Sequence, residues 1–203
     1  MSATIDFWYE FASTYSYPCA MRIEGEAKKR NIAVRWRPFL LGPIFGDQGM
    51  NDSPFNIYPA KGRYMWRDLE RICESLGLAF KRPDPFPQNG LIGARVATAL
   101  EGEARAAFSR GLYDAEFAKG LPIAEPETIA AVLKAIGEDA DLVLASANED
   151  SVKTRLRMET DAAREAGIFG APALVTSDGE LFWGNDRLHE ALDWAAKIAA
   201  TGK

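Results

Sequence analysis

The chain has 203 residues, of which 47% are hydrophobic and 26% charged, so it can bury one full core, with or without an inserted segment. Its formal net charge of -5 argues against broad nucleic-acid binding. No apolar stretch is long enough to cross a bilayer, and the first residues do not have the pattern of a secretory signal. We therefore expect a cytoplasmic protein that binds neither nucleic acid nor membrane.

Cysteine and histidine are scarce, which argues against several kinds of site. Cys19 and Cys73 do not form a Cys-X-X-Cys pair, so we expect no disulfide framework and no redox dithiol, and both residues should fill the core. His189 is the single histidine, so a Ser-His-Asp or Cys-His mechanism would need that one residue as its base. A histidine-rich metal site is disfavoured for the same reason, and we predict no metal.

The first predicted elements are a strand, Thr4–Tyr9, and a helix, Tyr15–Arg30. Ser13 lies between them, where two roles are open. Its hydroxyl can accept from a backbone amide as the helix N-cap. It can also donate to an anion that binds at the helix N-terminus beyond the strand end.

A second strand is predicted over Asn31–Phe39, where Ile32, Val34 and Trp36 alternate with polar or small residues. It should run parallel to the first strand, because a helix connects the two. Glycine, proline and polar residues then predict a long irregular segment over Leu41–Pro59.

Residues 61–167 carry helical patterns. Met65, Leu69 and Leu76 have helical spacing before Gly77, and Pro126 is placed to begin another helix. Further helices are expected around 91–100, 108–117 and 152–166, and the proline-rich stretch Arg82–Asn89 interrupts the series.

The chain ends with a predicted hairpin and helix. An apolar run begins at Pro172, turns at Ser177–Gly179 and is followed by a second apolar run, after which Asn185 and Asp186 stand where a helix should start. A strand end and a helix N-terminus therefore meet beside Gly170–Pro172, which is a suitable place for a small anionic ligand.

This order of elements is that of an α/β thioredoxin-like fold interrupted in its middle. We predict a thioredoxin-like domain made of residues 1–60 and 168–203, and a helical insertion domain of residues 61–167.

Three stretches resemble the 2-hydroxychromene-2-carboxylate isomerase family: the opening Asp6–Tyr17, the middle Lys61–Arg71, and Phe169–Pro172 followed by Trp183–Leu188. Members of this family are glutathione-dependent enzymes with a DsbA-like fold, close to the kappa-class glutathione transferases. The resemblance covers essentially the whole chain. It implies a DsbA-type fold with an all-helical insertion, glutathione as the cofactor, and a homodimer.

The resemblance also implies roles for single residues. Ser13 matches the family's catalytic serine, which contacts the glutathione sulfur, whereas Thr14 departs from the proline that usually follows it. Ala171 matches the residue before the family's cis-proline, so we expect the Ala171–Pro172 peptide bond to be cis. The main chain of Ala171 should then pair with the cysteinyl unit in the manner of an added strand.

Four further residues complete the implied cofactor site. Asn185 and Asp186 match the pair that holds the γ-glutamyl end, with Trp183 in the same signature. The alternative for Asp186 is a plain carboxylate at a helix N-terminus. Lys61 is the candidate for the glycyl carboxylate, with a surface lysine as the alternative.

Asn56 and Asn89 lie near positions that resemble the family's substrate contacts. The alternative is that both are simply turn residues. The substrate is a small aromatic carboxylate, and the reaction interconverts a hydroxychromene carboxylate with trans-o-hydroxybenzylidenepyruvate in aromatic catabolism. Covalent catalysis by a thiolate would replace one high activation barrier of the isomerisation by two lower ones. Two other functions stay open: a kappa-like glutathione transferase or peroxidase, and a non-catalytic thioredoxin-fold module that binds extended peptides.

Overall fold

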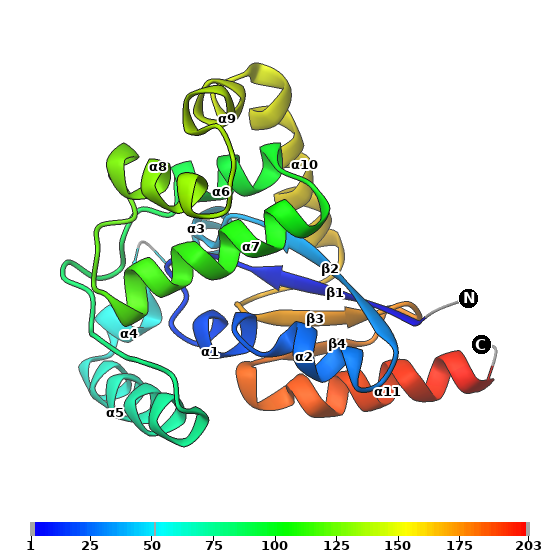
Figure 1. Cartoon of the computed structure of the whole chain (residues 1–203). Coiled ribbons are helices and arrows are strands. Elements are labelled where there is room, and N and C mark those ends of the chain that lie inside the picture. Colours follow the sequence, from blue (N-terminus) through cyan, green and yellow to red (C-terminus); the bar gives the residue numbers. More distant parts are fainter. Residues whose placement is uncertain (1–2, 51, 202–203) are drawn as a thin grey trace.

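Four strands form one mixed sheet in the order β2-β1-β3-β4 (Figure 1). The computed structural model describes residues 3–50 and 52–201. Strand β1 (Ala3–Tyr9) pairs in parallel with β2 (Ile32–Pro38), and antiparallel with β3 (Ala173–Thr176), which pairs antiparallel with β4 (Leu181–Trp183). The two predicted N-terminal strands, their parallel pairing and the C-terminal hairpin are thus confirmed.

The predicted helix Tyr15–Arg30 is wrong in one respect, because it is two helices. Helix α1 spans Ser16–Ala20 and α2 spans Ile23–Lys28. At the break, the amide of Arg22 bonds to the carbonyl of Cys19, three residues back, at 3.2 Å. This tighter turn ends the first helix, and Arg22 is left between the two helices with its side chain directed to another element.

The two faces of the sheet pack differently. Ile5, Phe7 and Tyr9 of β1 are fully buried in the larger core cluster, which also holds residues of α2 and α11. Trp8 points to the opposite face and packs in a smaller cluster with Phe39. Alternate side chains of one strand therefore serve two cores, as the period of two requires.

The segment from 41 to 59 is helical in part, contrary to the irregular loop expected there. Helix α3 spans Leu41–Asp47 and α4 spans Pro54–Ile57, and residue 51 lies outside the described residues. Ser53 caps α4, since its hydroxyl accepts from the amide of Phe55 at 3.3 Å, and Pro54 follows at the first helical position. A cap followed by proline is a helix-start signal, so the sequence did contain it.

Residues 61–167 contain helices and no strand, as predicted. The helices here are α5 (Pro59–Leu76), α6 (Leu91–Ala99), α7 (Gly102–Tyr113), the short π-helical turn η1 (Asp114–Ala118), α8 (Pro126–Ala135), α9 (Ala140–Ala147) and α10 (Asp150–Glu165). Helices α6 to α9 gather beyond β2, and α5 stands near the end where β1 finishes (Figure 1). The larger core cluster includes residues of both predicted domains, and the division into two domains stays a prediction.

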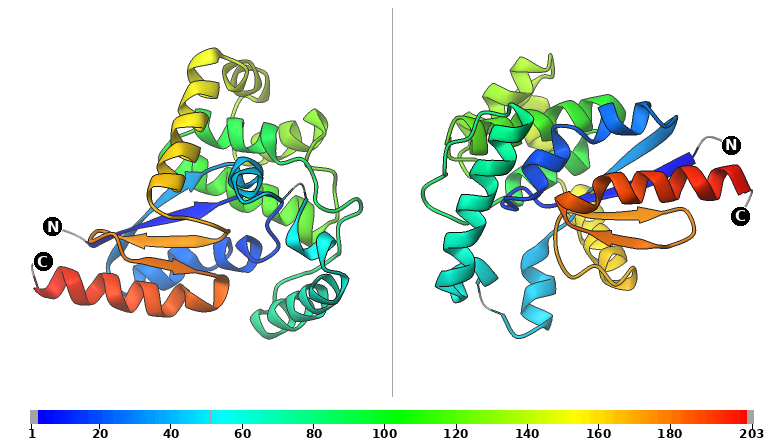
Figure 2. Two further views of the ribbon diagram at one scale, coloured as in Figure 1. Left: turned by 180° about the vertical axis from the view of Figure 1, so that it is seen from behind. Right: turned by 90° about the horizontal axis from the view of Figure 1, so that it is seen from below.

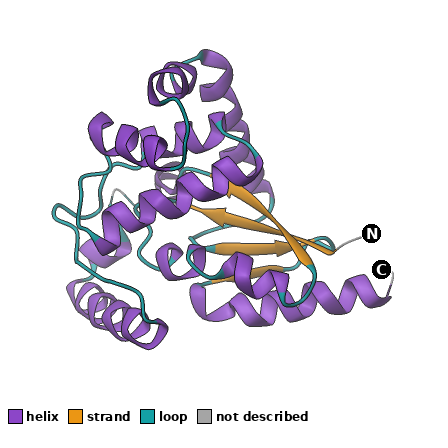
Figure 3. Ribbon diagram, in the orientation of Figure 1, coloured by secondary structure: helices purple, strands orange, loops and turns teal. Residues whose placement is uncertain are grey.

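The chain finishes with the 3-10 turn η2 (Asn185–Arg187) and helix α11 (Leu188–Thr201), which runs along the sheet (Figure 2). Figure 3 shows the four strands enclosed by helices. Of the described residues, none belongs to a helix that combines the length and the apolar character needed to span a membrane.

Candidate active site

A large cleft lies where β1 ends and β3 begins. Its volume is about 1390 Å³, and its walls come from the loop after β1, from α3 to α5, from residues 86–91 and from two C-terminal segments, 169–171 and 183–187. Seven of the residues predicted for the site line it: Ser13, Lys61, Asn89, Ala171, Trp183, Asn185 and Asp186. The fold thus brings together residues from the first, middle and last parts of the chain.

Two of the predicted residues do not line this cleft. Pro172 is buried behind its wall, where its carbonyl accepts from the amide of Gly184 at 3.0 Å. Asn56 is exposed on α4, and its amide donates to the carboxylate of Asp52 at 3.2 Å. Asn56 therefore contacts the cleft wall through Asp52 and through the carbonyl of Phe86, to which its amide donates at 3.4 Å; both residues line the cleft.

Ser13 is not a helix cap. Helix α1 begins three residues later at Ser16, and its N-cap residue, Tyr15, makes no side-chain capping bond. The hydroxyl of Ser13 instead donates to the carbonyl oxygen of Ala171 at 3.0 Å. The capping role is therefore wrong, and the hydroxyl faces the C-terminal wall of the cleft.

The wall opposite Ser13 is built by Gly170, Ala171 and Trp183. The Ala171–Pro172 peptide bond is cis, as expected. A Cβ atom at Gly170 would lie 2.5 Å from Nε1 of Trp183, so glycine allows the indole to lie against the backbone. Trp183 also packs on Phe169, with ring centroids 5.0 Å apart, and is about half exposed, so two aromatic faces are open to a ligand.

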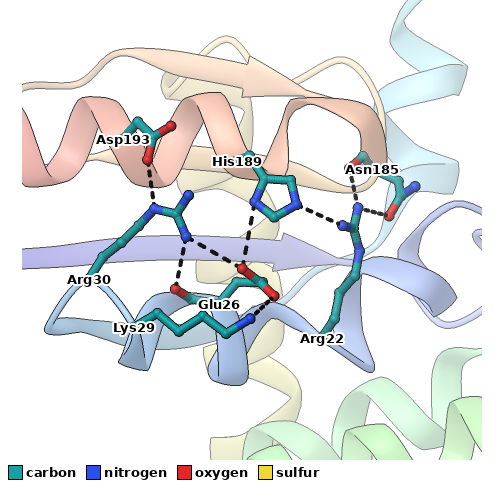
Figure 4. Close-up of polar contacts among 7 residues, drawn as sticks. All are labelled: Arg22, Glu26, Lys29, Arg30, Asn185, His189 and Asp193. Atoms are coloured by element: carbon teal, nitrogen blue, oxygen red, sulfur yellow. Dashed lines mark hydrogen bonds and ion pairs between the residues drawn. The ribbon is translucent and has the colours of Figure 1, made fainter. Parts of the chain in front are cut away.

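Asn185 is held from behind by Arg22 (Figure 4). The guanidinium of Arg22 donates to both the backbone and the side-chain oxygen of Asn185, each at 2.9 Å. His189 lies 3.3 Å from the same guanidinium and 3.7 Å from Glu26, on the exposed side of the molecule. The single histidine therefore contacts Arg22 and Glu26 and does not line the cleft, so it is not placed to act as a catalytic base.

Among the charged side chains that line the cleft are the two that the sequence analysis singled out, Asp186 and Lys61. Asp186 has 78% of its side chain exposed, and its nearest cation is Arg187 at 3.8 Å. Lys61 is exposed at the start of α5, with its ammonium 4.7 Å from the ring centroid of Tyr58. One anion and one cation in the same cleft suit a ligand that carries both an amine and a carboxylate.

Asn89 has a partner within its own loop. Its side-chain oxygen accepts from the amide of Leu91 at 3.0 Å, which is the bond expected of a residue before a helix start. Asn89 is therefore a turn residue, and it also lines the cleft.

The protein offers no reactive thiol of its own at this site. Cys19 and Cys73 are buried and free, as predicted. Burial raises the pKa of Cys19 to about 12 and that of Cys73 to about 11, so neither is a thiolate at neutral pH. In the chain from residue 3 to 50 and from 52 to 201, no group of three His, Cys, Asp or Glu side chains is arranged to hold a metal ion.

Glu10, Tyr15 and Asp68 are among the cleft residues that had escaped the sequence analysis. Glu10 lines the wall directly after β1, and Tyr15 donates from its hydroxyl to Asp68 of α5 at 3.0 Å. A charged residue at the carboxyl end of a strand was the available signal for Glu10. Tyr15 and Asp68 are 53 positions apart in the sequence, and no local sequence pattern predicts their contact.

Comparisons with known proteins agree with this architecture. Glutathione S-transferase kappa 2 of Caenorhabditis elegans is 27% identical over 95% of this chain and 92% of its own length. The 2-hydroxychromene-2-carboxylate isomerase of Sphingobium xenophagum is 26% identical over 93% and 95%. Among solved structures, a 2-hydroxychromene-2-carboxylate isomerase superposes with a TM-score of 0.86 at 23% identity, covering 98% of this chain and 97% of that one.

The chain also matches the DSBA-like thioredoxin domain over residues 4–193, which is nearly its whole length. That match includes the sheet, the helical segment between its two halves and every residue that lines the cleft. The protein therefore belongs to the DSBA-like thioredoxin family, as an enzyme-like member whose relatives are isomerases and kappa-class glutathione transferases.

Proposed function

We propose that the protein is a glutathione-dependent isomerase that interconverts 2-hydroxychromene-2-carboxylate and trans-o-hydroxybenzylidenepyruvate. The observation that carries this proposal is the cleft, in which the Ser13 hydroxyl meets the Ala171 carbonyl at 3.0 Å across 158 residues of sequence. Relatives named as an isomerase and as a glutathione transferase support the choice of cofactor. Burial raises the pKa of both protein thiols well above neutral pH, which is consistent with a thiolate supplied by a ligand.

The residues of the cleft fit glutathione. The main chain of Ala171 would pair with the cysteinyl unit, and the exposed carboxylate of Asp186 would take the γ-glutamyl amine. Lys61 would take the glycyl carboxylate. Asn185 would contribute its side-chain amide nitrogen, since Arg22 already occupies its oxygen.

The bond from Ser13 to Ala171 explains how the hydroxyl would become available. A cysteinyl N–H that donates to the Ala171 carbonyl would replace the Ser13 hydroxyl there. The hydroxyl would then turn its proton toward the neighbouring sulfur, where a hydrogen-bond donor stabilises the charged form. Helix α1 has only five residues, so we assign the larger share of this stabilisation to the hydroxyl and not to the helix dipole.

When bound, glutathione supplies a thiolate that adds reversibly to the conjugated substrate, so that a carbon–carbon double bond becomes single and can rotate. The side chains of Phe45, Phe86 and Trp183 give the cleft an apolar surface for the aromatic ring. Asn89, and Asn56 with its partner Asp52, would contact the polar part of the substrate.

The deciding experiment is a spectrophotometric assay with the chromene carboxylate, run with and without glutathione. Interconversion that depends on glutathione is the expected result. Turnover of haloaromatics or hydroperoxides in place of the chromene would assign a kappa-like transferase or peroxidase. Absence of turnover with every substrate, together with binding of extended peptides, would assign the non-catalytic module.

The homodimer that the family resemblance implies belongs to the same proposal, as do a cytoplasmic location and a place in aromatic catabolism. Sedimentation of the purified chain at two concentrations measures its oligomeric state directly. A monomer at both concentrations would contradict the dimer and leave the chemistry untouched.

A further inference from the structure

A carboxyl group next to Ser13 in the cleft has no role in the mechanism above. Glu10 follows β1 directly and lines the cleft wall. The amide of Ser13 donates to the carbonyl of Glu10 at 3.0 Å, which closes a tight turn, and the hydroxyl of Tyr113 donates to the same carbonyl at 2.8 Å. The backbone of Glu10 is thus fixed from two sides, and its side chain starts from the same turn as that of Ser13.

The carboxyl of Glu10 lies against the backbone of Gly90. A Cβ atom at Gly90 would lie 2.8 Å from Oε1 of Glu10 and 3.2 Å from Cβ of Phe11, so the carboxyl rests against bare backbone at the start of α6. Gly90 also lines the cleft. The carboxyl therefore lies at the wall of the cleft.

The surroundings of Glu10 withdraw its carboxyl from water. Burial raises its pKa to about 7, although the amide of Ala12 partly opposes this effect. The titratable groups around it are Tyr113 of α7, with Tyr9 beside it, and Glu116 of η1; Gly90 brings none from α6. Burial raises the pKa of all three above their ordinary values.

Glu116 needs separate mention because it is fully buried and neither of its oxygens has a hydrogen-bond partner in the described part of the chain. It lies in the π-helical turn η1, a rare backbone form that often occurs at functional sites. Burial first, and then the charge of Glu10, raise the pKa of Glu116. Two carboxyl groups that influence each other therefore lie in and behind the cleft wall, and only Glu10 reaches the cleft.

We propose that Glu10 is a further catalytic residue of the isomerisation, which gives a proton to the substrate carbonyl oxygen and takes it back. The inference rests on the proposed function. In the forward direction the O–H bond of Glu10 breaks, its electron pair stays on the carboxylate, and an O–H bond forms at the substrate oxygen. When the substrate double bond re-forms, the carboxylate removes that proton, so the cycle consumes no proton, electron or further reactant.

The other acids of the cleft do not suit this role. Asp68 accepts from Tyr15 and from Arg71, Asp52 accepts from Ser53 and Asn56, and Asp186 is largely exposed to water. A general acid works best when its pKa lies near the working pH, and burial moves the pKa of Glu10 there.

The test uses Glu10→Gln, with Glu116→Gln as the matched control, because both replace a carboxyl by an amide of the same shape. The first measurement is a carbon-13 NMR titration of labelled glutamate carboxyls in the protein without ligands. We expect one carboxyl that titrates near pH 7 in the wild type and in Glu116→Gln, and that is missing in Glu10→Gln.

The second measurement is kcat against pH at saturating glutathione. We expect the wild type and Glu116→Gln to lose rate above about pH 7, where Glu10 gives up its proton. Glu10→Gln should lose about a hundredfold in kcat near pH 6 and show no such decline. Its dissociation constant for glutathione should stay within about twofold of the wild type, since the cofactor residues are unchanged.

Three results would overturn the inference while leaving the isomerase in place. Glu10→Gln could keep the wild-type kcat and its fall above pH 7, or that fall in kcat could be lost in Glu116→Gln instead. The NMR titration could also show no carboxyl that titrates near pH 7. A wild-type protein that has the titrating carboxyl and yet shows no glutathione-dependent interconversion would overturn the proposed function, and the proton transfer with it. The NMR titration separates these two failures.

Discussion

At the scale of single residues, the Ser13 hydroxyl is the centre of the proposed chemistry. A free thiol with a pKa of about 8.5 is only about 3% ionised at neutral pH. Lowering this pKa to about 6.5 corresponds to roughly 2.7 kcal/mol, which is more than a helix dipole is expected to supply. A positioned donor must therefore contribute, and Ser13 is the hydroxyl that faces Ala171 across the cleft.

We predict that Ser13→Ala binds glutathione almost normally, raises the pKa of the bound thiol and loses most of the turnover at neutral pH. The loss follows because the thiolate would lack its hydrogen-bond donor. Ultraviolet titration of the bound thiolate and the isomerisation rate, both measured on the same variant, check this outcome.

Asp139→Ala is a suitable control for Ser13→Ala. Asp139 is a true N-cap, whose carboxylate accepts from the amides of Asp141 and Leu142 at 3.1 Å, far from the cleft lining. Its removal should lower the free energy of unfolding by about 1 kcal/mol and leave the thiol pKa unchanged. If Ser13→Ala behaved in the same way as this control, the proposed role of Ser13 would be wrong.

Asp186→Ala tests the γ-glutamyl end. From the sequence, an ammonium left unpaired in a partly desolvated site would be expected to cost on the order of 1.5–3 kcal/mol. Because the Asp186 side chain is 78% exposed, we now expect a smaller effect, up to about 1 kcal/mol or roughly fivefold in affinity. Calorimetry measures it.

Glu190→Ala is the control for Asp186→Ala, because it removes the same charge one turn away, where Glu190 pairs with Arg187 outside the cleft lining. Equal dissociation constants for glutathione in the two variants would mean that Asp186 is only a carboxylate at a helix N-terminus and does not bind the γ-glutamyl end.

At the scale of elements, local signals predicted the strands and most helices, and long-range contacts decided the exceptions. Residues 15–30 contain good helix formers, yet the helix breaks at Met21 and Arg22, where Arg22 reaches Asn185 across 163 residues. No pattern within the helix itself encodes that partner. The short helix α4, in contrast, carried a readable cap at Ser53 and a proline at 54.

Gly170→Ala tests the wall that β4 presents to the cleft. The new Cβ would lie 2.5 Å from Nε1 of Trp183, so the indole must move, which its half-exposed position permits at small cost in stability. We expect altered tryptophan fluorescence and weaker glutathione binding. Gly25→Ala, in α2 with nothing within 4 Å of the new atom, should change neither and should stabilise the helix by about 0.5–1 kcal/mol.

At the scale of the whole molecule, buried carboxyls reverse the usual effect of pH on stability. In the unfolded chain Glu10 ionises near pH 4.5, whereas in the folded protein it keeps its proton until about pH 7. The folded state therefore binds more protons between these values, and the contribution of Glu10 to stability is lost as pH rises.

We predict that Glu10→Gln removes this decline. Relative to the wild type, its free energy of unfolding should be unchanged below about pH 4 and higher by up to about 3 kcal/mol above pH 7. Urea unfolding of both proteins across this range checks the difference. Glu116→Gln should change in the same direction, and a difference that does not vary with pH in either variant would contradict the burial of these carboxyls.

The sequence predicted the fold class and seven of the residues that line the cleft, because strand ends, glycine–proline turns and a family signature are local features. It did not predict Glu10 as a cleft acid, since the burial of its carboxyl depends on Gly90 and Tyr113, which lie 80 and 103 positions away. The fold supplies these neighbours through α6 and α7, and only the folded chain brings them together.

The two bonds that close the cleft, Ser13 to Ala171 and Arg22 to Asn185, join the first eighth of the chain to the last fifth. Closing loops of this length costs chain entropy, and the cost is smaller once the intervening helices have condensed. During synthesis the partners of Ser13 and Arg22 leave the ribosome late. A nascent chain that ends before residue 168 can form β1 and β2 side by side. It cannot bind the ligand, because it still lacks the C-terminal wall of the cleft.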